Sequence, residues 1–199
     1  MGDSTKLTER QQQVHNYLVA LTSLYGVVTP KQFLLVFNRY NENKLLKAEL
    51  MKYSNKLNNK FYYQGYFIYE NFIVNTKISD EEINLIISYQ QSKKYYNPTK
   101  EEIEAHISPT YYEKTEYTDR LKTFLLDNKV SILSIDQLMS DIVFAIKAEK
   151  RNQEVFDVLN KYNFEFKDVK SAQVFSKMLM DLHNNTRKWA NCGMRPIEM

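Results

Sequence analysis

The sequence is poor in the residues that cross-link or interrupt a chain, with one cysteine, four glycines and four prolines among 199 residues. A single cysteine excludes a disulfide framework and a multi-cysteine zinc site. The shortage of glycine and proline excludes collagen-like and loop-rich scaffolds. No apolar run approaches 18 residues, and residues 1–6 contain no apolar stretch. These absences predict a chain without a transmembrane helix or secretory signal, and therefore a cytoplasmic protein with no membrane partner.

Arginine is also scarce, since lysine supplies 21 of the 27 basic residues. The net charge is only +3, and 43% of the residues are hydrophobic, which is typical of a globular chain with a core. The basic excess is local. Residues 1–80 contain ten Lys or Arg against six Asp or Glu, whereas residues 81–199 contain 17 against 18. This asymmetry indicates an anionic partner for the first part of the chain.

The order of elements in residues 1–78 is that of a winged helix. Apolar spacings of three and four predict helices over residues 8–25, 31–40 and 44–58. The second follows Thr29-Pro30, which fits an N-cap with proline at the first helical position. Residues 61–69, with a central Gln64-Gly65, predict a tight β-hairpin that residues 72–74 could complete. In this layout the third helix is the one that reads a DNA groove.

The rest of the chain is predicted to be helical. Capping boxes begin at Ser79, Thr99 and Ser134, and a last helix is expected to start near Asp168. We therefore expect a mainly α protein, with a winged-helix-like N-terminal unit and small β-hairpin over residues 1–78 and an α-helical bundle over residues 79–199.

The third predicted helix is rich in lysine and points to nucleic acid. Flexible cations on an exposed face suit phosphate contacts, with the hairpin as a wing. The alternative interpretation is that these lysines form an ordinary solvated surface of a lysine-rich protein. The helix also contains no arginine, which weakens the case for sequence-specific contacts to DNA bases. The candidate nucleic-acid-binding residues are Lys44, Lys47, Lys52, Asn55, Lys56, Lys60 and Tyr66.

Tyr66 is included because the hairpin is dense in aromatic residues, which could stack on exposed bases. Alternating strand geometry sends about half of such residues into the core, so a packing role explains most of them. Exposed tyrosines would suit a protein interface equally well.

No catalytic motif stands out, so we predict no catalytic residues, no metal and no cofactor. Glu165-Phe166-Lys167 with upstream Asp157 resembles the carboxylate set of metal-dependent nucleases, but Asp157 lies in a predicted helix. The three histidines are scattered, and Cys192 has no base at a fixed spacing. Residues 184–189, Asn-Asn-Thr-Arg-Lys-Trp, are interpreted as a hydrogen-bonded knot that orders the end of the last helix.

The run from Leu182 to Glu198 resembles a segment of uncharacterised helical proteins from Gram-positive bacteria and their phages, in which it directly precedes a cysteine-rich SEC-C zinc motif. Residues 17–33 and 95–115 are similar to the same family. The zinc motif itself is absent from this sequence, so no metal site is carried over. The resemblance implies a cytosolic, non-enzymatic helical protein carried by a mobile element.

Three functions are considered, and the third and least favoured is a metal-dependent nuclease that uses Asp157 and Glu165-Phe166-Lys167. The first is a non-catalytic DNA-associated regulator or adaptor that binds nucleic acid through the lysine-rich helix and the hairpin. The second is a phage-type inhibitor that binds and blocks a nucleic-acid-binding host protein, such as a defence nuclease. The sequence does not fix the oligomeric state.

Overall fold

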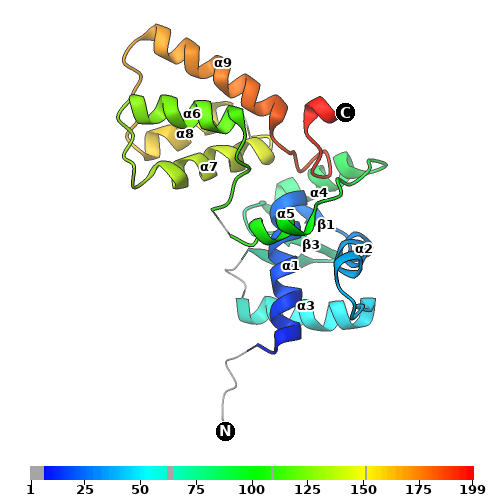
Figure 1. The fold of residues 1–199 in the computed structure, drawn as a ribbon. Helices are drawn as coiled ribbons and strands as arrows, with labels where there is room; N and C mark the ends of the chain where they lie inside the picture. The colour runs from blue at the N-terminus through cyan, green and yellow to red at the C-terminus, as the bar shows by residue number, and fades with distance from the viewer. Residues whose placement is uncertain (1–6, 62–64, 109, 151) are drawn as a thin grey trace. The chain divides into compact units, whose positions relative to one another are not determined.

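The computed structural model describes residues 7–61, 65–108, 110–150 and 152–199, leaving aside the side chains of residues 55–61 and 152. The chain divides into two compact units, unit 1 (Met1–Pro109) and unit 2 (Thr110–Met199). Each is shown in Figure 1, and each has its own hydrophobic core. The protein is mainly α-helical with one small sheet, as predicted.

Unit 1 begins with a long helix that supplies much of its core. Helix α1 (Glu9–Tyr25) starts at a capping box, in which Thr8 and Gln11 exchange side-chain-to-backbone hydrogen bonds, and it ends at Gly26. Thr29 caps the next helix, as the sequence predicts. The further elements are β1 (Val27–Val28), α2 (Pro30–Tyr40), α3 (Lys47–Phe61), β2 (Tyr66–Tyr69), β3 (Phe72–Asn75), α4 (Asp80–Gln90) and α5 (Lys100–Ala105).

The sheet has the strand order β1-β3-β2, and both pairings are antiparallel. Strand β1 lies between the first and second helices, and its Val27 pairs with Val74 of the central strand. The predicted order of three helices followed by a hairpin is therefore present, and β1 adds a third strand to the hairpin. Strand β1 was not predicted, because its two residues are too few to show the alternation of a strand.

The hairpin turns at a different place from the one predicted. Strands β2 and β3 pair from Tyr66↔Asn75 to Tyr69↔Phe72, so the turn consists of Glu70 and Asn71. Glu70 has a φ of 52°. Gly65, predicted to form the turn, lies just before β2 with a φ of 114°, a backbone conformation that favours glycine. Helix α3 extends to Phe61, and the predicted Gln64 lies outside the described residues.

Residues 79–108 belong with the winged-helix-like unit. The Tyr25 hydroxyl donates to the Tyr96 carbonyl at 2.7 Å, and the Gln90 side chain donates to the Tyr25 carbonyl at 2.8 Å. Ile103 of α5 lies in the same core as α1. The division at Pro109–Thr110 thus lies later than the expected 78–79. An apolar stripe shows that a helix is half-buried, but does not show which core it joins.

Unit 2 contains α6 (Glu116–Asp127), α7 (Ile135–Lys147), α8 (Asn152–Lys161) and α9 (Val169–Asn185), followed by a 3-10 turn, η1 (Pro196–Glu198). Helix α6 packs on α9, and α7 packs on α6 and α8, so these four helices form the predicted bundle. Helix α9 begins at Val169, close to the predicted start near Asp168, and the Asp168 side chain caps it. The predicted capping box at Ser134 is wrong, since its backbone is near-helical and its hydroxyl donates back to the Ser131 carbonyl.

Among the residues described in both units, no helix combines the length and the apolar character needed to cross a bilayer.

Candidate nucleic-acid interface

The connection between α2 and α3 is fixed by one asparagine. The Oδ1 atom of Asn38 accepts a hydrogen bond from the Leu45 amide at 2.7 Å, and its Nδ2 donates to the Leu45 carbonyl at 3.0 Å. Leu45 is buried in the core of unit 1. The turn before the third helix is therefore anchored through both main-chain groups of a single buried residue, which sets where α3 begins.

Lys44, a predicted phosphate contact, makes local contacts in this turn. Its Nζ atom donates to the carbonyls of Asn38 at 2.6 Å and Asn41 at 3.0 Å, at the end of α2. A cation there satisfies carbonyls that lack helical partners and opposes the negative end of the helix dipole. The exposed Lys44 thus acts as a helix C-terminal cap, and its ammonium group is engaged without an anionic ligand.

The only acidic residue in α3, Glu49, is paired with α1. Its Oε1 atom lies 3.5 Å from Nε of Arg10. The Arg10 guanidinium also donates to the Lys44 carbonyl at 3.2 Å and lies over the Phe37 ring, 5.0 Å from the ring centre. Arg10 was not among the predicted site residues, because 39 positions separate it from Glu49 and no local pattern links them.

Lys47 and Lys52 of α3 are exposed, as the prediction requires. Between them, Ala48 is also exposed, and Leu50 is buried. Leu46 is 71% exposed and precedes the helix, whereas its neighbour Leu45 is buried in the core.

The remaining α3 candidates are Asn55, Lys56 and Lys60. Their backbone belongs to α3, and their side chains are outside the part of the chain that the structure describes. At 3.6 residues per turn, positions 56 and 60 follow Lys52 by about one and two helical turns. Positions 52, 56 and 60 therefore share one side of α3, whereas position 47, five residues before Lys52, lies about 140° around the helix axis.

Tyr66 is not available to nucleic acid, which corrects the sequence prediction. Its side chain is fully buried, and its ring centre lies 5.8 Å from that of His15 on α1. Burial strongly raises the pKa of its phenol. Tyr66 therefore contributes packing between the hairpin and α1. Alternating strand geometry places about half of the hairpin residues in the core, and Tyr66 is one of the residues that face inward.

The wing itself is short and offers little positive charge. Each strand has four residues, and the exposed residues at its tip are Glu70 and Asn71. The side chains of Phe67 and Tyr69 are half-buried. A carboxylate at the tip repels phosphate, so contacts from the wing would depend on Asn71 and main-chain amides.

The described residues do not assemble the other sites that the sequence suggested. They contain no cluster of three or more His, Cys, Asp or Glu able to hold a metal ion. Asp157 lies in α8, and Glu165 in the loop before α9, so the two are not on the adjacent strands that the nuclease arrangement needs. His15, His106 and Cys192 are buried.

Comparison of the chain with protein-family models, curated proteins and solved structures gives no match to any of them.

Proposed function

We propose that unit 1 is a nucleic-acid-binding module of a non-catalytic, DNA-associated regulator or adaptor of mobile-element origin. The observation that carries the proposal is a winged-helix element order whose third helix exposes Lys47 and Lys52, while its one carboxylate is paired with Arg10. Lysine ammonium groups that are free of competing carboxylates are suited to phosphate oxygens.

Helix α3 would supply the contacts in this function. In helix-turn-helix proteins the second helix of the motif enters the major groove, while the preceding helix crosses the backbone. Here α2 and α3 form that pair, and Asn38 fixes the connection between them. Lys47 and Lys52, followed by Lys56 and Lys60 in the sequence, would contact phosphates. Such contacts position a protein and carry little sequence information.

The test is duplex binding by the full chain across a range of salt concentrations. Lys47→Glu combined with Lys52→Glu should weaken binding at low salt at least about tenfold and lower the slope of log K against log salt by about 2, since each phosphate contact contributes about 0.9. Lys94→Glu combined with Lys100→Glu is the matched control, because it changes the net charge equally at exposed positions of the same unit outside α3.

Equal loss of binding in both double variants would show a diffuse charge effect and contradict the role of α3. Failure of the wild-type chain to bind any duplex at low salt would overturn the proposal and leave the inhibitor hypothesis. That alternative predicts tight, salt-resistant association with a single host protein.

A further inference from the structure

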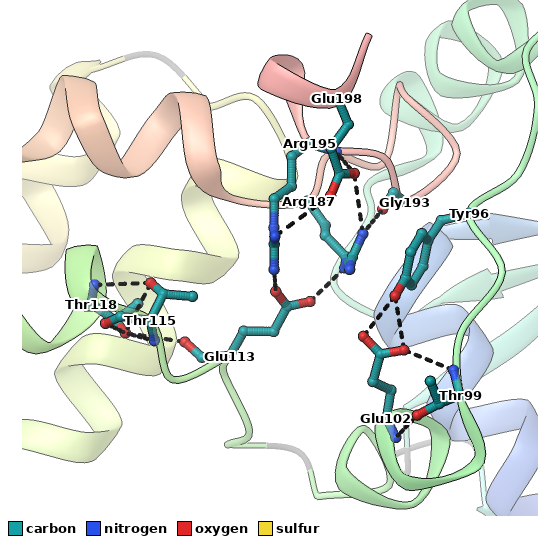
Figure 2. A network of polar contacts seen from close by, with 10 residues as sticks. All are labelled: Tyr96, Thr99, Glu102, Glu113, Thr115, Thr118, Arg187, Gly193, Arg195 and Glu198. Carbon is teal, nitrogen blue, oxygen red and sulfur yellow. Dashed lines mark hydrogen bonds and ion pairs between the residues drawn. The ribbon is translucent and has the colours of Figure 1, made fainter.

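The C-terminal segment of unit 2 is held by a compact ion-pair network. We call residues 186–199 the strap. Arg187 Nε lies 2.6 Å from Glu113 Oε1, and Arg195 Nη2 lies 2.6 Å from Glu113 Oε2. Glu198 completes the network, at 3.4 Å from Arg187 and 3.5 Å from Arg195. Figure 2 shows the two arginines meeting at the Glu113 carboxylate. The strap therefore ties the end of unit 2 to the residues that precede α6.

A second set of contacts attaches the strap to the end of α7. The Trp189 amide donates to the Lys147 carbonyl at 3.0 Å, and Lys188 Nζ donates to the Ile146 carbonyl at 2.8 Å. The Trp189 ring packs edge-on against Phe144, with 5.3 Å between ring centres. These contacts bury Trp189 to 1% exposure. The strap is thus fixed at Glu113 and at the end of α7.

The attachment depends on one carboxylate surrounded by cations. Arg187 and Arg195 of the strap and Lys147 of α7 all act on Glu113. Burial tends to raise the pKa of Glu113, but the hydrogen bond from Arg195 and the charges of Arg187, Arg195 and Lys147 outweigh it, so the pKa lies below its ordinary value of 4.5. Protonation of Glu113 would leave Arg187 and Arg195 with only the longer ion pairs to Glu198, at 3.4 and 3.5 Å. Losing one partner of a buried pair is costly, because the remaining charge is then less well compensated.

The second attachment contains a contact with the same acid sensitivity. Lys188 Nζ lies 3.0 Å from His183 Nδ1, and Lys188 is only 3% exposed. Since an ammonium group can only donate, His183 must be neutral and accept through Nδ1. Burial, followed by the charge of Lys188, lowers the pKa of His183 to about 4. Burial also lowers the pKa of Lys188, to about 8, although the charge of Glu149 acts in the opposite direction, so Lys188 remains mostly an ammonium group at neutral pH. Protonated His183 would place two cations in contact.

We propose that acid releases the strap. Residues 186–199 would then detach together from Glu113 and from the end of α7, while the bundle of helices α6–α9 stays folded. Both titrating groups act in the same direction. Their folded-state pKa values lie below the unfolded values, so their stabilisation is complete at neutral pH and is lost as the pH falls. For His183 the window runs from 6.5 down to about 4, and Glu113 adds to the loss below 4.5.

Trp189 is the only tryptophan in the sequence and lies within the strap, so its emission reports on the strap alone. The full chain is titrated from neutral to acid pH, and tryptophan emission is compared with far-ultraviolet circular dichroism. The proposal expects a red shift of emission at a higher pH than the loss of helical signal. Coincident transitions would overturn it, because the strap would then open only with the whole unit.

Two variants separate the strap from general acid unfolding. Glu113→Gln should raise the fraction of open chains at neutral pH by about tenfold, the ratio expected for a lost charge-assisted hydrogen bond, as read by acrylamide quenching of Trp189. His183→Gln removes a titrating group and should move the emission transition to lower pH. Glu104→Gln, which breaks an exposed ion pair with Lys100 in unit 1, is the control and should leave Trp189 unchanged.

An emission transition in His183→Gln at the wild-type pH, together with wild-type quenching in Glu113→Gln, would contradict the role of both groups. If Glu113→Gln does not fold, His183→Gln and the wild-type titration still decide the question, since neither requires the loss of the Glu113 charge at neutral pH.

Discussion

At the scale of the residue, the same side-chain type serves different purposes in different places. Lys47 and Lys52 are exposed, Lys44 caps a helix through two carbonyls, and Lys188 is buried between a carbonyl and an imidazole. A count of lysines could not separate these roles. The capping role depends on how the chain turns after α2, and the buried role depends on a neighbour from α7.

Tyr66 gives a prediction at this scale. Its hydroxyl is buried and makes no hydrogen bond to any residue that the structure describes. Tyr66→Phe should therefore keep the free energy of unfolding at the wild-type value or raise it by up to about 1 kcal/mol, because the substitution removes a buried hydroxyl that has no hydrogen-bond partner. Tyr66→Ala should lower it by about 3–5 kcal/mol by leaving a cavity.

Urea unfolding of both Tyr66 variants gives these values, and duplex binding of Tyr66→Phe should match that of the wild-type chain. A clear loss of stability in Tyr66→Phe would show that the hydroxyl has a hydrogen-bond partner in solution.

At the scale of the element, contacts to main-chain atoms hold the connection that precedes α3. Asn38 holds Leu45 through its amide and carbonyl, and Arg10 donates to the Lys44 carbonyl. The element order of unit 1, the caps at Thr29 and Thr99 and the existence of α3 could all be predicted, because they depend on local patterns. Strand β1 and the pairing of Arg10 with Glu49 could not, because each depends on residues distant in the sequence. The turn at Glu70 is local, but Gln64-Gly65 gave the stronger turn signal in the sequence.

Asn38→Ala tests the placement of α3 without changing any charge. It removes both hydrogen bonds to Leu45, so the free energy of unfolding should fall by about 1–3 kcal/mol. If α3 binds DNA, affinity should fall as well at temperatures where the variant is fully folded. Urea unfolding and duplex titration measure the two effects. Unchanged stability would mean that the core contacts of Leu45 hold the turn without Asn38.

At the scale of the whole molecule, each unit has a core of its own. The first core runs from Val14 to Ile103 and the second from Tyr112 to Leu182, and they share no residue among those described. The sequence predicted two units but placed the boundary too early. Helices α4 and α5 carry ordinary amphipathic patterns, and their attachment to α1 involves the Tyr25 hydroxyl and the Gln90 amide, which no periodicity reveals.

Separate expression of residues 1–109 and 110–199 tests this division. Each fragment should show helical circular dichroism and a cooperative thermal transition, because a domain with its own core can fold alone. The 1–109 fragment should retain the duplex affinity of the full chain under the proposed function. A fragment of 1–78 should be unstable, since it lacks Ile83, Ile86 and Ile103 of the core. A well-folded 1–78 fragment would contradict the assignment of α4 and α5 to unit 1.

The contacts of Asn38 and Lys44 with the α2–α3 connection have a consequence for how the exposed side of α3 can vary. Asn38 and Lys44 hold the connection before α3 through peptide groups, whereas the side chains at positions 48 and 52 of α3 are exposed. New side chains can be installed at those two sites while the supporting frame is kept. That separation makes unit 1 a suitable starting scaffold for libraries in which ligand preference is selected without rebuilding the fold.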